Sequence, residues 1–215
     1  DGYEYERSLK LRSVITDSTS AYTRDLKEEV CRQFWLCSYQ TNDGYEAVDT
    51  IINPFEDLAL EDTITLYDIV GQISPVTRNA YNDIFCQPTI YYDYDVAQET
   101  YTKNMSITNT DKDTFDSSYV TAEGIDDTYK EKLWTLARQL YRRYKIINEA
   151  PADMTELSLI YRSEEAAYYL YNWLYWQNRR RIRFELPYGI AKNWYHTKRF
   201  TLDLPHQTGG DQLYC

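Results

Sequence analysis

The sequence lacks every short motif that would place a nucleophile, a phosphate or a metal ion. It contains no G-x-S-x-G, no P-loop, no G-x-G-x-x-G and no H-E-x-x-H. It has two histidines, His196 and His206, and neither has an acidic or thiol partner at metal-ligand spacing. We therefore expect no catalytic residues, no metal and no cofactor, in a protein that is not an enzyme.

Basic residues and long apolar runs are also scarce. Lys and Arg number 23 against 34 Asp and Glu, so the net charge is −11 at pH 7. Phosphate binding needs clustered Lys and Arg, which argues against nucleic acid as a partner. No apolar run approaches the length that spans a bilayer, which argues against a membrane. Because the chain starts at Asp1 rather than Met, we expect a processed protein or part of a longer one.

The cysteines are too few and too scattered for a disulfide scaffold. They are Cys31, Cys37, Cys86 and Cys215. The spacing of Cys31 and Cys37 matches neither a Cys-x-x-Cys redox pair nor a zinc knuckle. Free thiols and an intracellular origin are the expectation.

Periodicity in the first half predicts a helix and two hairpins. Apolar residues at helical spacing indicate a helix from Ala21 to Leu36. The β-prone runs 36–40 and 45–48 flank Asp43-Gly44, which is typical of a hairpin. A second hairpin is predicted from residues 89–96 and 101–107.

Two further segments of this half have less regular patterns. Residues 61–74 fit either a strand or a helix and end at Pro75. The polar, acidic stretch from Thr108 to Asp116 is predicted to be a loop.

The second half predicts two long helices and three strands. Thr128-Tyr129-Lys130-Glu131 fits a capping box at the start of one helix, and Ser163 followed by Glu164 and Glu165 is typical of the start of another. Alternation of apolar and polar residues predicts strands at 155–161, 181–187 and 199–205. Helical spacing predicts six inward-facing residues: Leu133, Leu136, Leu140, Leu170, Trp173 and Leu174.

Together these elements predict an α+β fold, with antiparallel hairpins and strands packed against three main helices. We expect two subdomains. Residues 1–120 form a helix and hairpin-rich part, and residues 121–215 form a helix-strand-helix-strand part.

Two groups of carboxylates are candidates for chemistry. Asp111-Lys112-Asp113-Thr114-Phe115-Asp116 resembles a calcium loop, but it lacks the turn glycine and has Ala122 where the bidentate acid belongs. A solvated acidic loop is favoured. Asp93 and Asp95 share a face of a predicted strand and could serve as acid and base in sugar hydrolysis, although exposed acid pairs on strands are far commoner.

Arginines and tyrosines are the remaining unusual features. Arg179, Arg180, Arg181 and Arg183 form a dense basic patch, which we expect to pair with carboxylates of this chain or of a neighbour. The 23 tyrosines include the runs Tyr91-Tyr92-Asp93-Tyr94 and Tyr168-Tyr169-Leu170-Tyr171. Aromatic residues are enriched at interfaces, but a domain can also use tyrosine in its core, and both interpretations stay open.

Taken in order, these segments resemble phage tail proteins of the tip-attachment and baseplate-hub kind. The resemblance rests on Val30–Leu36 leading into Asn42-Asp43-Gly44, on Tyr67–Pro75 followed by Ile84–Tyr94, and on Glu164–Leu186. The sequence departs from the family pattern at Ala191–His196, and Gly209-Gly210-Asp211 replaces the familiar end of the domain.

The resemblance implies a structural role in a phage or prophage tail. Expected partners are other tail proteins and copies of the same chain in a ring, in a virion assembled in the bacterial cytoplasm. It implies no catalytic residues. The alternative is a carbohydrate-binding module or glycosidase-like domain, since Trp and Tyr platforms beside paired acids also suit sugars.

Overall fold

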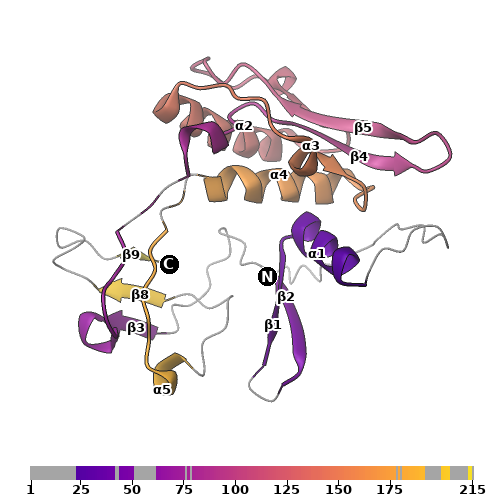
Figure 1. The fold of residues 1–215 in the computed structure, drawn as a ribbon. Helices are drawn as coiled ribbons and strands as arrows, with labels where there is room; N and C mark the ends of the chain where they lie inside the picture. The colour runs from indigo at the N-terminus through magenta and orange to yellow at the C-terminus, as the bar shows by residue number, and fades with distance from the viewer. Residues whose placement is uncertain are drawn as a thin grey trace, which may run out of the picture. The chain divides into compact units, whose positions relative to one another are not determined.

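The computed structural model describes residues 23–41, 44–50, 62–75, 77, 79–177, 179, 181–191, 200–203 and 213–214. These residues form an α+β fold with three main helices, as predicted (Figure 1). They divide into two compact units. Unit 1 contains the described residues up to Phe34 together with Ala80–Gln177, and unit 2 contains those between Trp35 and Asn79 and those after Gln177.

The units do not follow the predicted subdomains 1–120 and 121–215. A boundary after residue 120 would cut strand β6 (Val120–Thr121), which pairs with β5 (Thr100–Ile107). Each unit is instead built from segments that lie far apart in the sequence. Because the segments of the two units alternate along the chain, no change in composition marks a single boundary between them.

Unit 1 is organised around a four-stranded sheet in the order β6-β5-β4-β7. Strands β4 (Thr89–Asp95) and β5 form the predicted hairpin, and the short strand β7 (Glu156–Leu157) runs parallel to β4. Alternate residues of the hairpin are buried, among them Ile90 and Met105, while Tyr91 and Asn104 on the opposite face are exposed. One face of the hairpin therefore packs against the rest of the unit.

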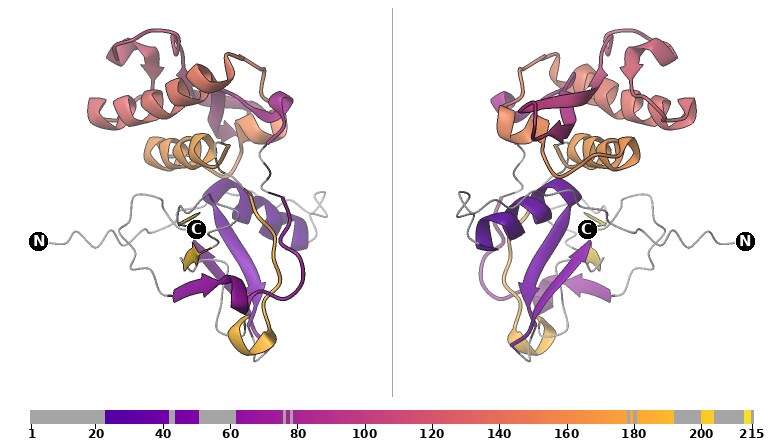
Figure 2. Two further views of the ribbon diagram at one scale, coloured as in Figure 1. Left: turned by 90° about the vertical axis from the view of Figure 1, so that its left-hand side faces the viewer. Right: turned by 90° about the vertical axis from the view of Figure 1, so that its right-hand side faces the viewer.

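Helices α2 (Asp127–Tyr144) and α4 (Ser163–Gln177) contact the hairpin and each other (Figures 1 and 2). Five of the predicted inward residues are buried, as predicted: Leu133, Leu140, Leu170, Trp173 and Leu174. Leu136 is only half-buried, because it lies at the edge of the stripe formed by Leu133, Ala137 and Leu140. The buried Trp134, which the sequence pattern did not select, extends the stripe on the other side.

The start of α2 differs from the predicted capping box. The cap is Asp126, whose Oδ1 accepts a hydrogen bond of 2.9 Å from the Tyr129 N–H. Thr128 lies inside the first turn instead. The aspartate two residues earlier satisfies a free amide of the first turn, so the helix starts there.

The predicted strand at 155–161 is mostly wrong. Residues Ala152–Thr155 form a single helical turn, α3, and only Glu156–Leu157 form a strand. The Thr155 hydroxyl donates to the carbonyl oxygen of Pro151 (3.2 Å), which holds this residue in the turn.

The N-terminal part of the described chain confirms the predicted helix and first hairpin. Helix α1 (Thr23–Phe34) belongs to unit 1, and strands β1 (Leu36–Gln40) and β2 (Glu46–Thr50) belong to unit 2. Gly44 in the connecting turn has φ of 83°, a left-handed conformation that glycine adopts without strain.

The other sheet of unit 2 has three strands in the order β3-β8-β9. Strand β3 (Asp62–Thr65) answers the open question over residues 61–74 in favour of a strand, followed by the 3-10 turn η1 (Leu66–Asp68). It runs parallel to β8 (Phe200–Asp203), which confirms the strand predicted at 199–205, and β9 (Leu213–Tyr214) pairs with β8 on its other side.

The predicted strand at 181–187 is wrong, although its alternation is real. Among the described residues, the segment forms the isolated bridges Thr77↔Arg181 and Val70↔Glu185 and accepts a backbone hydrogen bond from the Ser74 N–H at the Arg183 carbonyl (2.9 Å). Between them, the Arg183 N–H donates to the Ser74 side-chain oxygen (2.7 Å), so a side chain replaces the backbone acceptor of a regular ladder. The apolar residues of this segment are still turned to one side: Ile182, Phe184 and Leu186 pack on the buried pair Ile64 and Leu202. Helix α5 (Tyr188–Ala191) follows.

Candidate interaction surface

The acids Asp93 and Asp95 are each engaged in shaping the β4–β5 hairpin. Asp93 has φ of 59° and accepts a hydrogen bond from the Thr102 hydroxyl (2.8 Å) while pairing with Lys103 (3.4 Å). Asp95 accepts from the Ala97 N–H (2.9 Å) at the start of the turn. The two carboxylates thus bind separate local partners.

The acidic loop is bound to α2 by arginines. Asp113 Oδ1 lies 2.8 Å from Arg138 Nη2 and 2.7 Å from Arg142 Nη2, and these guanidinium groups lower the pKa of the carboxyl. Asp116 accepts from the hydroxyl and the N–H of Ser118, which lowers its pKa as well. Among the described residues, no group of three His, Cys, Asp or Glu lies together in a way that could hold a metal ion.

Three of the four cysteines are described, and none of these three forms a disulfide. Cys31 and Cys37 are half-buried, and burial raises the pKa of Cys86 to about 11. Cys215 and both histidines, His196 and His206, lie outside the described residues.

Of the two uses of tyrosine left open by the sequence, the structure shows packing inside the chain. In the predicted runs, Tyr92, Tyr169 and Tyr171 are buried. Tyr101 of β5 instead lies against Tyr94 and Tyr91, with ring centroids 5.0 and 6.4 Å apart. Burial, with the nearby Glu156 carboxylate second, raises the pKa of Tyr101 to about 12.

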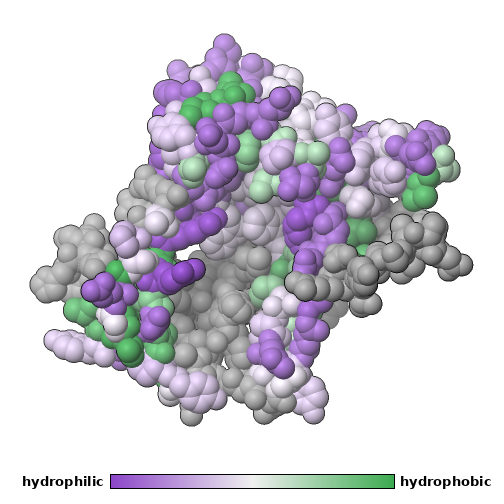
Figure 3. Space-filling model, in the orientation of Figure 1, coloured by the Kyte–Doolittle hydropathy of each residue, from purple (hydrophilic) through white to green (hydrophobic). Residues whose placement is uncertain are grey.

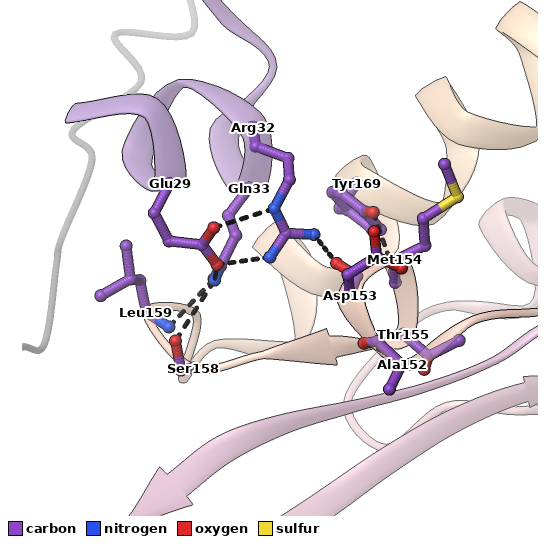
Figure 4. Close-up of polar contacts among 10 residues, drawn as sticks. All are labelled: Glu29, Arg32, Gln33, Ala152, Asp153, Met154, Thr155, Ser158, Leu159 and Tyr169. Atoms are coloured by element: carbon purple, nitrogen blue, oxygen red, sulfur yellow. Dashed lines mark hydrogen bonds and ion pairs between the residues drawn. The ribbon is translucent and has the colours of Figure 1, made fainter. Parts of the chain in front are cut away.

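A polar cluster fixes α1 within unit 1 (Figure 4). The Arg32 guanidinium donates to the Glu29 carboxylate and to the backbone carbonyl of Asp153. The buried Gln33 donates to Glu29 and Ser158 and accepts from the Leu159 N–H (2.9 Å). Burial acts to raise the pKa of Glu29, but the hydrogen bonds from Arg32 and Gln33 outweigh it and lower the pKa. This cluster stabilises the fold.

Unit 1 also contains a pocket of about 410 Å³. It lies between the start of β4 and the segment that follows α2. Tyr91, 43% exposed, and Ile147, 58% exposed, supply apolar surface. The polar residues of its lining include Gln87, Thr89, Asn148 and Glu149. Apart from Tyr91, which belongs to a tyrosine run, no sequence signal marked these residues, because they come together only when β4 and the 147–150 segment meet.

Unit 2 exposes several large apolar side chains and arginines. Tyr67 is 98% exposed and Tyr188 is 74% exposed, and Leu66 and Val70 are exposed as well. Figure 3 shows hydrophobic side chains gathered on the surface around β3 and the turn after it.

Two arginines of the predicted basic patch, Arg181 and Arg183, are exposed on unit 2. Val70 pairs with Glu185, and the same segment carries the exposed Arg181 and Arg183. Within the described part of the chain, no carboxylate forms an ion pair with Arg181 or Arg183. Arg179 is exposed and has an interaction of its own, and Arg180 is outside the described residues.

Comparison of the chain with protein-family models, with curated proteins and with solved structures found no match. Of the helices that the structure describes, none is both long and apolar enough to cross a membrane.

Proposed function

We propose that this protein is a structural component of an assembly and that the exposed face of unit 2 binds a neighbouring protein. In its specific form, the proposal is a component of a phage or phage-like tail at the tip or baseplate hub. The specific form is supported by the sequence resemblance, and the general form by the surface of unit 2.

The observation that carries the proposal is the contrast between the core and the surface of unit 2. Its described buried apolar side chains are Ile64 and Leu202. Its exposed large apolar side chains are Tyr45, Val48, Leu66, Tyr67, Val70 and Tyr188. Gathered exposed apolar residues mark surfaces that bind other proteins, and tyrosine is among the residues enriched there.

The basic residues of unit 2 add charge complementarity. Arg181 and Arg183 stand two residues apart and are exposed, in a chain whose net charge is −11. A guanidinium group binds carboxylates in a bidentate geometry. A neighbour with carboxylates opposite these arginines fits this face, and a second copy of this acidic chain is one such neighbour.

Co-expression with the proteins encoded by neighbouring genes tests the proposal. We expect a stable complex or ring by size-exclusion chromatography with light scattering. Tyr67→Ser combined with Tyr188→Ser should weaken it at least about tenfold, since aromatic residues dominate binding at interfaces. The matched control is Val96→Ser, which alters an exposed apolar residue of unit 1 in the β4–β5 turn and should leave association unchanged. If the chain stays monomeric and co-purifies with none of these proteins, the proposal is wrong.

A second candidate, carbohydrate binding, is favoured by the pocket of unit 1. Tyr91 offers an exposed ring beside polar side chains, an arrangement that suits a sugar. A glycan array tests this candidate. Binding that is lost in Tyr91→Ala would support it, and an array without signal would oppose it.

A further inference from the structure

We infer that the pocket of unit 1 binds a cationic side chain, the guanidinium of arginine or the ammonium of lysine, from a partner protein. This deepens the proposed assembly function and rests on it.

The side-chain amides of the pocket use three of their four N–H donors internally. Asn148 Nδ2 donates to the carbonyl oxygens of Tyr81 and Ile84, each at 2.9 Å. Because both acceptors are carbonyl oxygens, the amide nitrogen must face them, and the Asn148 side-chain oxygen is left as an acceptor. Gln87 Nε2 donates to the Thr110 hydroxyl (2.9 Å).

Of the remaining polar side chains, Thr155 and Glu149 also favour a ligand that donates hydrogen bonds, while the Thr89 hydroxyl can donate or accept. The Thr155 hydroxyl donates to the Pro151 carbonyl oxygen. The exposed Glu149 carboxylate only accepts hydrogen bonds and adds a negative charge. Among the described residues, no cationic side chain lines the pocket. A ligand that brings several N–H donors and a positive charge matches this inventory better than one that needs donors from the protein.

The walls of the pocket suit the same ligand. Tyr91 is held against Tyr101, so its ring is positioned before a ligand arrives. A guanidinium or ammonium group is attracted to the face of an aromatic ring, and guanidinium also stacks on it. Ile147 and Pro88 provide apolar surface for the methylene stem of arginine or lysine. The net charge of −11 would draw a cationic partner toward the chain.

Binding of N-acetyl-arginine amide and N-acetyl-lysine amide to the full chain, followed by NMR chemical-shift mapping, tests the inference. N-acetyl-norleucine amide is the neutral control, and methyl β-glucoside represents the sugar alternative. We expect the cationic probes to shift the signals of Tyr91, Asn148 and Glu149 in a saturable manner. The norleucine probe should not shift them.

Variants separate local recognition from general charge attraction. Glu149→Gln should weaken binding of the arginine probe about tenfold, because it removes a charged hydrogen-bond acceptor. Glu131→Gln removes one exposed negative charge from α2, outside the pocket, and should have little effect. Tyr91→Phe keeps the ring face and should bind normally, while Tyr91→Ala should bind about threefold to fivefold more weakly.

Several outcomes would overturn the inference. Equal weakening by Glu149→Gln and Glu131→Gln would show attraction to the net charge alone. Binding of the glucoside without the cationic probes would assign the pocket to a sugar. If the chain forms a complex that depends on Tyr67 and Tyr188 while no probe shifts the pocket signals, this inference fails and the proposed function stands. If the probes bind but no complex forms, the proposed function fails instead.

Discussion

Unit 1 and unit 2 differ in how much apolar surface each one buries. All the buried apolar side chains of the described chain lie in unit 1, apart from Ile64 and Leu202. Unit 1 packs two long helices on a sheet, whereas the three-stranded sheet of unit 2 has strands of two to four residues. A small core supplies little stability by itself. On the proposed function, unit 1 provides the stable body and binding of a neighbouring protein would stabilise unit 2 further.

The largest expected effect is the loss of stability caused by a cavity in the core of unit 1. Leu133→Ala should lower the free energy of unfolding by about 2 to 5 kcal/mol, because the side chain is fully buried. Leu136→Ala, on the same helix, should cost about half as much, since Leu136 is half-buried. Urea unfolding of both variants measures the difference. Equal losses in the free energy of unfolding would contradict the difference in burial between Leu133 and Leu136.

A smaller effect is expected from the polar cluster of α1. Gln33→Ala removes the acceptor of the buried Leu159 N–H, so the free energy of unfolding should fall by about 1 to 3 kcal/mol. Gln40→Ala, an exposed glutamine in unit 2, is the matched control and should change it by less than about 0.5 kcal/mol. If Gln33→Ala left the free energy of unfolding unchanged, the cluster would not stabilise the fold.

A still smaller loss of stability is expected at acidic pH, where Glu29 becomes protonated. Glu29 has a pKa below its ordinary value of 4.5 in the folded protein, so its stabilisation is present above that value and is lost as the pH falls through the folded pKa. Between about pH 5 and pH 3, the wild type should therefore lose more stability than Glu29→Gln. Parallel slopes in urea unfolding across this range would contradict the prediction.

The smallest expected effect is a difference in reactivity between the thiols of the native protein, which involves no change in stability. Cys86 is buried and has a pKa of about 11, so at neutral pH little of it is thiolate. Maleimide should label the half-buried Cys31 and Cys37 before Cys86 in the native protein. Labelling followed by mass spectrometry of peptides measures the order, and unfolding in urea should remove the difference. Fast native labelling of Cys86 would contradict its burial.

Sequence alone predicted most elements of unit 1. The β4–β5 hairpin and helix α4 follow from local periodicity, which survives in the folded chain. Local pattern could not choose between Asp126 and Thr128 as the cap of α2, because both residue types cap helices. It also could not show that Thr155 belongs to a helical turn, since the apolar alternation of 155–161 favours a strand and the turn is held by bonds from Thr155 to Pro151 and Ala152.

Features that depend on distant contacts could not be predicted. The strand expected at 181–187 failed because Ser74, over a hundred residues away, supplies a side-chain acceptor to Arg183. The pocket likewise joins Gln87 and Tyr91 to Asn148 and Glu149. No periodic pattern connects such residues, so neither the pocket nor the interleaved units leave a signal in the sequence.

Hydrogen–deuterium exchange at single residues tests the contrast between the units most directly. In the isolated chain, the Val70 N–H, bonded to Glu185, and the Arg181 N–H, bonded to Thr77, should exchange much faster than the Ile90 and Met105 amides of the β4–β5 hairpin. On assembly with a neighbouring protein, the Val70 and Arg181 amides should slow while the hairpin amides stay as they were. Equal protection of both units in the isolated chain, with no change on assembly, would contradict the account.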